Sequence, residues 1–141
     1  MKKIVLLSLI FVTSILSAGN APEVIQKEFD QRFPGASDVI WERENPKGWI
    51  AEFVWNGQNI IANYSFPGAW IETKTQIPIA ELPEAVTETI TSFYPDWKIL
   101  VATRIENSKS EIQYKTAIQK EGKMQEIVLK AEGTLLLVGL K

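Results

Sequence analysis

The chain of 141 residues contains neither cysteine nor histidine. Without cysteine it has no disulfide bond and no thiolate nucleophile, and without histidine it lacks the side chain that most often serves as a general base near neutral pH. The two absences also remove the common protein ligands of zinc and copper. Glycine-spaced motifs for a nucleophilic serine or for phosphate binding are missing as well. We therefore expect no cofactor, no metal and no catalytic activity.

Long apolar runs are scarce too, and the one that stands out lies at the start of the chain. Two lysines precede an apolar segment at residues 4–16, and small residues follow it. This order is typical of a cleaved secretory signal, and the run is shorter than the ~20 apolar residues that span a membrane. We predict a signal peptide at residues 1–21 with cleavage after Ala18 or Ala21. Export to the periplasm, or secretion, without a stable membrane anchor follows from it.

Neither sign of charge dominates. The chain carries 15 basic and 17 acidic side chains, and removal of Lys2 and Lys3 leaves 13 against 17, a net charge of −4. A mildly acidic surface of mixed sign argues against a nucleic-acid partner, which requires a basic footprint. The remaining ~120 residues suffice for one domain or for two small lobes, and lobes of ~60 residues without disulfides are marginal alone. We expect any such lobes to share buried surface.

Residues 22–73 and 83–138 repeat the same order of prolines, glycines and apolar positions. At an offset of 61 residues the matched pairs are Pro22 and Pro83, Ile25 and Val86, Phe29 and Ile90, Phe33 and Tyr94, and Phe53 and Tyr114. After a slip of four residues, Gly57 matches Gly122 and Gly68 matches Gly133. We assign the slip to a longer hairpin turn at residues 120–123. The matches predict one supersecondary unit used twice.

Each unit is predicted to be a helix followed by four strands. Apolar residues recur at helical spacing from Ile25 to Phe33, and alternation with period two follows. Asn56-Gly57 indicates a type I′ hairpin turn, and residues 74–80 are interpreted as the connector between the halves. The predicted class is α+β, a tandem duplication in which each half packs one helix on a four-stranded antiparallel meander. The halves are residues 22–77 and 78–141.

These turn and strand residues also carry a family resemblance. The order from Phe33-Pro34-Gly35-Ala36 through Gly57 to Gly68-Ala69-Trp70-Ile71-Glu72-Thr73, repeated from Pro83 onward, resembles the PepSY-like family of small secreted bacterial proteins. That family is similar in fold to β-lactamase inhibitor protein, and the resemblance implies a protein-contacting or inhibitory role. The inhibitor presents an aspartate on a hairpin turn and has disulfides. The matching turn here, Trp55-Asn56-Gly57-Gln58, lacks the aspartate, which argues against inhibition of a β-lactamase specifically.

Tryptophan is distributed unevenly. Four of the five tryptophans, Trp41, Trp49, Trp55 and Trp70, lie in the first half. Two interpretations are open: the rings form a recognition surface, where tryptophan is enriched, or they fill the core beneath a short helix. The outward face of the first predicted sheet also mixes branched aliphatic residues with polar ones, which favours contact with a partner.

The leading hypothesis is an exported, non-catalytic module that binds another envelope protein or a peptide through its sheet surface. The predicted binding residues are Trp41, Trp49, Trp55, Trp70, Asn56, Ile50, Glu52 and Val54. One alternative is a binder of carbohydrate or of a small apolar ligand on exposed tryptophans. A remote alternative is a hydrolase that uses Glu42, Glu44 and Glu52, which would require an apolar pocket that raises the pKa of one carboxyl.

Overall fold

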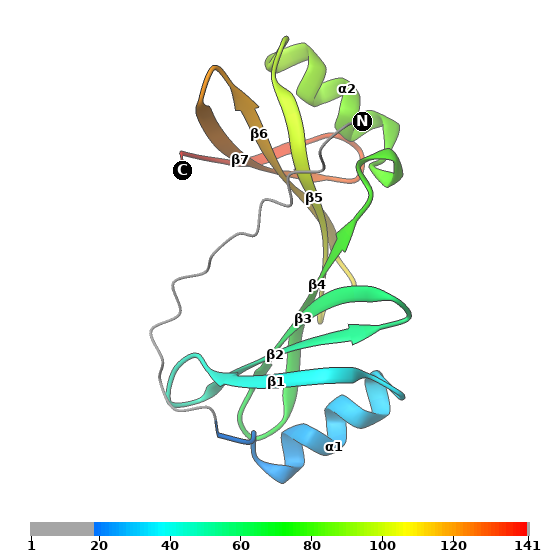
Figure 1. Ribbon diagram of the computed structural model, residues 1–141, viewed down its shortest axis with the longest axis vertical. Coiled ribbons are helices and arrows are strands. Elements are labelled where there is room, and N and C mark those ends of the chain that lie inside the picture. The colour runs from blue at the N-terminus through cyan, green and yellow to red at the C-terminus, as the bar shows by residue number, and fades with distance from the viewer. Residues whose placement is uncertain (1–18, 141) are drawn as a thin grey trace, which may run out of the picture.

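A computed structural model describes residues 19–140 (Figure 1). The elements are α1 (Glu23–Arg32), β1 (Ser37–Arg43), β2 (Gly48–Trp55), β3 (Gln58–Ser65), β4 (Ala69–Ile77), the 3₁₀ helix η1 (Ile79–Glu81), α2 (Glu84–Phe93), β5 (Lys98–Asn107), β6 (Ile112–Lys120), β7 (Lys123–Lys130) and β8 (Leu135–Leu140). The predicted signal segment falls almost wholly on residues 1–18, which lie outside the described residues.

Both α-helices begin directly after a proline. Pro22 and Pro83 take the cap positions, where the proline ring sets the backbone angle φ and no amide hydrogen is needed. Each helix then buries two residues of its apolar stripe, and α1 buries Ile25 and Phe29. Packing of this apolar stripe against the sheet stabilises both helices, because ten residues are too few for a stable isolated helix.

The eight strands form a single antiparallel sheet in the order β1 to β8. The α+β class and the antiparallel meander are thus confirmed, but the halves do not form two separate sheets. Backbone pairing of β4 with β5, from Glu72 opposite Asn107 to Ile77 opposite Ala102, joins them. The assignment of residues 74–80 to a connector was wrong in its first part. Residues 74–77 continue β4, because alternation persists to Ile77 and the neighbouring strand β5 supplies backbone hydrogen-bond partners.

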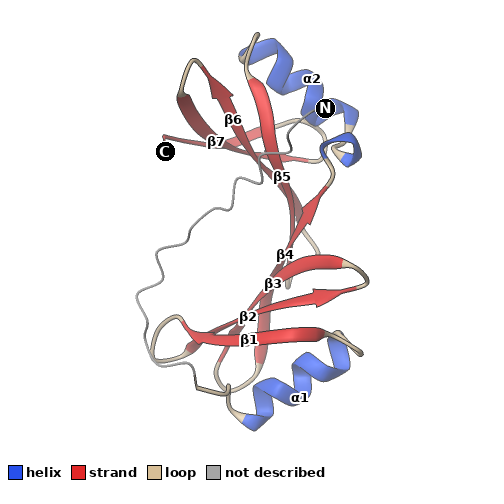
Figure 2. Cartoon of the chain, viewed as in Figure 1, coloured by secondary structure: helices blue, strands red, loops and turns tan. Residues whose placement is uncertain are grey.

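Two hydrophobic cores lie on the same face of this sheet. The first gathers Ile25, Phe29, Phe33, Ala51, Phe53, Ile60, Ala62 and Tyr64 beneath α1, and the second gathers Ile77, Leu82, Val86, Ile90, Ala102, Ile118, Ile127 and Leu129 beneath α2. Ile60 of the first core pairs with Thr75, and Ile77 of the second core is two residues further along β4 on the same side. Figure 2 shows the helices at opposite ends of the molecule with the sheet between them. Within residues 19–140, no helix lies on the other face of the sheet.

Local irregularities recur at matching places in the two halves. The strand bulge at Asn63/Tyr64 is matched by one at Val128/Leu129, 65 residues later. Asn56-Gly57 and Glu121-Gly122 are both two-residue hairpin turns with positive φ at both residues, as type I′ requires.

The assignment of the four-residue slip to residues 120–123 was therefore wrong. Trp41 pairs with Ala51, and its counterpart Ala102 pairs with Thr116. The offset of 65 consequently begins with β2 and β6, because β5 has 10 residues and β1 only 7. By this register Trp49 corresponds to Tyr114 and Trp55 to Lys120, so the earlier match of Phe53 with Tyr114 does not hold.

Candidate functional site

The predicted binding residues are divided between the two faces of the sheet. The four tryptophans lie on the helix-covered side, where all of them pack against the first core. Ile50, Glu52 and Val54 alternate with Ala51 and Phe53 along β2 and so project from the opposite face. Asn56 is exposed in the hairpin turn between β2 and β3. The structure therefore contains two separate candidate surfaces.

Trp41 and Trp49 are part of the packing beneath α1. The Trp41 ring meets the Phe29 ring edge to face, with centroids 5.2 Å apart, and lies 6.0 Å from the Tyr64 ring. Trp49 is half-buried against the same core. Edge-to-face contacts of this kind stabilise a core beyond the area that they bury. For Trp41 and Trp49, packing in the first core explains why the position holds a tryptophan.

Trp55 and Trp70 are held at the edge of that core instead. The Trp55 indole N–H donates to the Pro34 carbonyl at 2.9 Å, and its ring stands edge to face against Phe33 at 5.3 Å. The Trp70 indole N–H donates to the Thr73 hydroxyl at 2.9 Å, and the Arg32 guanidinium lies 3.9 Å from the centre of the Trp70 ring. Both rings are thereby fixed in orientation, and both line a cavity.

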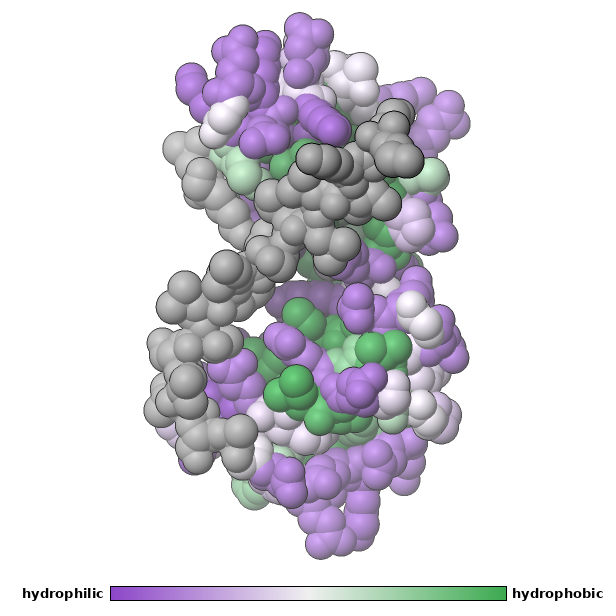
Figure 3. Space-filling model, viewed as in Figure 1, coloured by the Kyte–Doolittle hydropathy of each residue, from purple (hydrophilic) through white to green (hydrophobic). Residues whose placement is uncertain are grey.

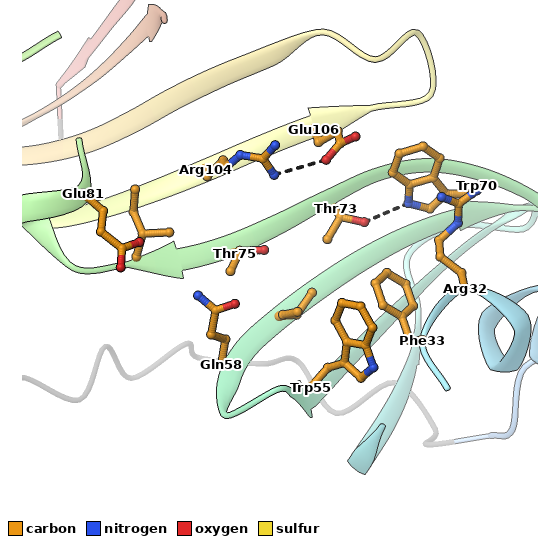
Figure 4. Close-up of a pocket in the computed structure, with 12 residues that line it drawn as sticks. Arg32, Phe33, Trp55, Gln58, Trp70, Thr73, Thr75, Glu81, Arg104 and Glu106 are labelled. Carbon is orange, nitrogen blue, oxygen red and sulfur yellow. Dashed lines mark hydrogen bonds and ion pairs between the residues drawn. The ribbon is translucent and has the colours of Figure 1, made fainter. Parts of the chain in front are cut away.

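That cavity, which we name the helix-side cleft, has a volume of about 440 Å³. It lies between the end of the β2–β3 hairpin, strands β4 and β5, and η1, and it is open to solvent (Figure 4). Its lining includes Trp55, Trp70, Gln58, Thr75, Glu81 and Arg104. Residues of both halves contribute, so no single half could form it. Arg104 and Glu81 come from the second half and were not among the residues singled out in the sequence.

The second surface, which we name the open face, is the side of the sheet opposite α1 and α2, where no helix of the described part of the chain lies. In the first half it carries Ile40, Ile50, Val54 and Ile61 interspersed with Glu42, Glu52, Asn63 and Ser65, as the alternation predicted. Ile40 is 62% exposed. Figure 3 shows hydrophobic side chains gathered over the strands of the first half and bordered by hydrophilic ones.

Asn63 has an unusual position on this face. It is only 8% exposed, and its side-chain carbonyl oxygen is buried without a hydrogen-bond partner within residues 19–140. Its cross-strand neighbours are Ile50 and Glu72, neither of which offers a side-chain donor in the ionised state. A buried acceptor left unpaired costs about 1–3 kcal/mol. Sequence alternation placed Asn63 on this face, but its burial depends on neighbouring side chains and was missed.

The second half of the open face is more polar, because the strand register places Gln113, Lys115, Glu126, Val128 and Lys130 together. The Lys115 ammonium lies 3.7 Å from a Glu126 carboxylate oxygen. Lys74 and Glu72 on β4 form a comparable ion pair on the first half of this face, 2.9 Å apart, so ion pairs do not distinguish the halves. The choice of the first half rests on Ile40, Ile50, Val54 and Ile61.

The carboxylates considered for hydrolysis do not converge. Glu42 and Glu52 sit on neighbouring strands of the open face, where Glu52 is exposed, and Glu44 lies beyond the end of β1. Among residues 19–140 no three acidic side chains come close enough to hold a metal ion. Burial raises the pKa of one phenol, that of Tyr64, but this side chain lies within the first core. None of the helices in that range has the length and hydropathy to cross a membrane.

Sequence comparison identifies the family. The sequence model of the family described as "Putative beta-lactamase-inhibitor-like, PepSY-like" matches residues 50–136, more than half of the chain. The chain belongs to this PepSY-like family. The resemblance seen in the sequence is thereby confirmed. None of the curated proteins compared with the chain matches it.

Solved structures of several Bacteroides proteins share the fold. A Bacteroides fragilis protein described as "BLIP-like" is 23% identical with a TM-score of 0.73, over 86% of this chain and 89% of that one. A Bacteroides eggerthii structure described as "putative periplasmic proteins" is 19% identical with a TM-score of 0.79, over 86% and 90%. A DUF2874 family protein of Bacteroides uniformis is 18% identical with a TM-score of 0.79, over the same shares. At these identities the likeness concerns the fold alone.

Proposed function

We propose that this PepSY-like protein is an exported, non-catalytic binding module that holds a protein or peptide partner on the first half of its open face. The observation that carries the proposal is the group of aliphatic side chains there: Ile40 is 62% exposed, and Ile50, Val54 and Ile61 are partly exposed. Isolated exposed aliphatic residues are ordinary, but a contiguous group of them on a sheet face without a helix marks a contact surface.

The chemistry of the surface indicates what the partner presents. Ile40, Ile50 and Ile61 favour an apolar centre, and burial of their surface contributes about 25 cal/mol per Å². Glu42 and Glu52 between them favour basic side chains at the rim of that centre. We propose an apolar partner surface with lysine or arginine around it.

The periplasm or the extracellular space is the proposed location. The fold-related protein described as periplasmic supports it, as does the predicted signal at residues 1–21. The partner is then another envelope protein or a peptide. The family description, with its reference to a β-lactamase inhibitor, supports a protein-contacting role.

We also infer that residues 22–77 and 78–141 descend from one duplicated unit. The recurrence of the bulges, hairpin turns and helix-capping prolines at offsets of 61 and 65 supports this. So does the approach of Gly68 to Val24 on α1, which is matched by the approach of Gly133 to Ala85 on α2. A duplicated unit leaves one half free to diverge, which fits the difference between the two halves of the open face.

Site-specific photocrosslinking tests the proposed function. A photoreactive residue replaces Glu52 on the open face, and in the control it replaces Glu88, which is exposed on α2. Incubated with an envelope extract, the Glu52 probe should crosslink a defined protein or peptide that the Glu88 probe does not. Equal labelling from both positions, or none from Glu52, would contradict the proposal.

A matched pair of variants then measures the contact. Ile50→Lys is well chosen because its counterpart in the second half is Lys115, so the sheet accepts lysine at this place. We expect it to weaken binding of the crosslinked partner by about tenfold or more, equivalent to about 1.4 kcal/mol. Val128→Lys, on the second half of the open face, should leave the affinity unchanged. Equal affinities of wild type and Ile50→Lys would refute the assignment.

A further inference from the structure

The helix-side cleft has an aromatic wall with a fixed orientation. Because the indole N–H groups of Trp55 and Trp70 already donate to Pro34 and Thr73, neither needs a ligand as acceptor. The Trp55 ring therefore offers the cavity a carbon surface rather than a donor, and so does the part of the Trp70 ring that the Arg32 guanidinium leaves uncovered. Figure 4 shows them along one side of the cleft, with Trp55 next to Gln58.

The opposite side of the cleft supplies polar groups from three elements. Thr75 comes from β4, Arg104 from β5 and Glu81 from η1, and Gln58 closes the hairpin end. The side chains of Gln58, Thr75 and Glu81 make no hydrogen bond within residues 19–140, so their donors and acceptors are available to a ligand. An amide, a hydroxyl and a carboxylate together can both donate and accept.

Both guanidinium groups at the cleft already have carboxylate partners. Arg104 lies 3.1 Å from the Glu106 carboxylate, and Arg32 lies 3.4 Å from Glu28 while it covers the Trp70 ring. With both guanidinium groups partnered, Glu81 is the ionic group left over. An anionic ligand would be repelled by the Glu81 carboxylate and would find no unpaired cationic side chain among the described residues of the cleft lining. The lining thus favours a ligand without net negative charge.

We propose that the helix-side cleft is a second binding site, separate from the open face, and that its ligand is a neutral saccharide. A pyranose ring has an apolar face of C–H groups that packs on an indole, and its hydroxyls both donate and accept hydrogen bonds. The cleft offers these two features side by side. Its volume of about 440 Å³ lies in the range of small-ligand sites.

Comparison of the halves shows that the fold does not require these residues. The counterpart of Trp55 is Lys120, that of Trp70 is Leu135, and that of Arg32 is Phe93, by the register of the strands and the helix offset. The second half keeps its helix and four strands without the aromatic wall. The tryptophans at the edge of the cleft are therefore available for a role beyond folding.

NMR titration of the mature chain tests the proposal directly. The probes are cellobiose, maltose and N,N′-diacetylchitobiose, with glucuronate and glucosamine as charged comparators, and the readout is the indole N–H resonances of Trp55 and Trp70. At least one neutral disaccharide should shift both resonances in a saturable way and leave that of Trp97, in the second half, in place.

Two variants locate the effect. Trp55→Ala should weaken the affinity by about tenfold or more, which is typical for loss of an aromatic stacking platform. Gln58→Leu keeps a similar volume and should weaken it through a lost hydrogen bond, so the test survives if Trp55→Ala unfolds. Ile50→Lys on the open face should bind the saccharide as wild type does.

Three results would overturn the saccharide proposal: no saturable indole shift with any neutral disaccharide, unchanged affinity in Gln58→Leu, or tighter binding of a charged comparator. Each of them leaves crosslinking from Glu52 unaffected, so failure at the cleft and failure at the open face are distinguishable.

Discussion

Gly133 gives a sharp test of how closely the second half packs on its helix. A Cβ atom at this position would lie 2.5 Å from the Ala85 carbonyl oxygen and 2.7 Å from the Thr89 hydroxyl, and the residue has φ of +89°. The Thr89 hydroxyl also lies 2.8 Å from the Gly133 carbonyl, to which it donates. Gly133→Ala therefore combines backbone strain with a clash against helix backbone and the disturbance of a hydrogen bond.

The magnitude follows from these contributions. Positive φ costs an alanine about 1–2 kcal/mol, and overpacking of a tight site costs about 1–3 kcal/mol more. Gly133→Ala should thus lower the free energy of unfolding by between about 2 and 5 kcal/mol. Gly122→Ala is the matched control, because its φ is +77° but no heavy atom lies within 4 Å of the added Cβ. It should cost only the strain.

Urea unfolding of the mature chain, followed by circular dichroism, measures both variants. The difference between them isolates the close approach of the β7–β8 turn to α2 and should be at least about 1 kcal/mol. Equal losses of stability in the two variants, within ~0.5 kcal/mol, would show that Gly133 does not pack closely against α2.

Three further predictions concern the two cores and the edge of the sheet. Burial raises the pKa of Tyr64 above its usual value, so above about pH 10 the unfolded chain releases the phenol proton while the folded chain keeps it. The free energy of unfolding should therefore fall by up to ~1.4 kcal/mol per pH unit. Tyr64→Phe should remove this part of the pH dependence in urea unfolding, and an unchanged pH dependence would contradict the prediction. Ile118→Ala, at a fully buried position, should cost about 2–5 kcal/mol in the same assay, whereas Ile40→Ala on the open face should cost less than ~0.5 kcal/mol. Leu137 is 61% exposed on β8, which pairs only with β7 among the described strands, so Leu137→Lys should reduce concentration-dependent light scattering with little change in stability; identical scattering would show that this edge does not associate.

The elements of the fold were predictable because their signals are local. A proline before each helix, apolar residues at helical spacing, and Asn56-Gly57 between alternating segments specify a helix start, a buried stripe and a type I′ turn within a few residues of chain. The family resemblance depended on the same local residues. The division of β2 into a tryptophan face and an Ile50–Glu52–Val54 face also followed from alternation.

Long-range pairing was not predictable in the same way. The extension of β4 to Ile77 depends on hydrogen bonds to β5, which follows only after η1 and α2. The position of the four-residue slip likewise became clear only from the strand register. The two hairpin turns have the same length but dissimilar sequences, Asn56-Gly57 and Glu121-Gly122, so the sequence did not show that they match. Such pairings join residues far apart in the chain, and no local preference specifies them.

Local sequence patterns specify the order of the helical and alternating segments, a chain without disulfides, and the aliphatic character of one strand face. The single continuous sheet with both helices on one side follows only from long-range packing. That arrangement buries Asn63 without a partner, stacks Arg32 on Trp70, and brings Arg104 and Glu81 of the second half opposite Trp55 of the first. These features arise because burial and cavity shape depend on which distant side chains meet, whereas alternation and capping depend on immediate neighbours.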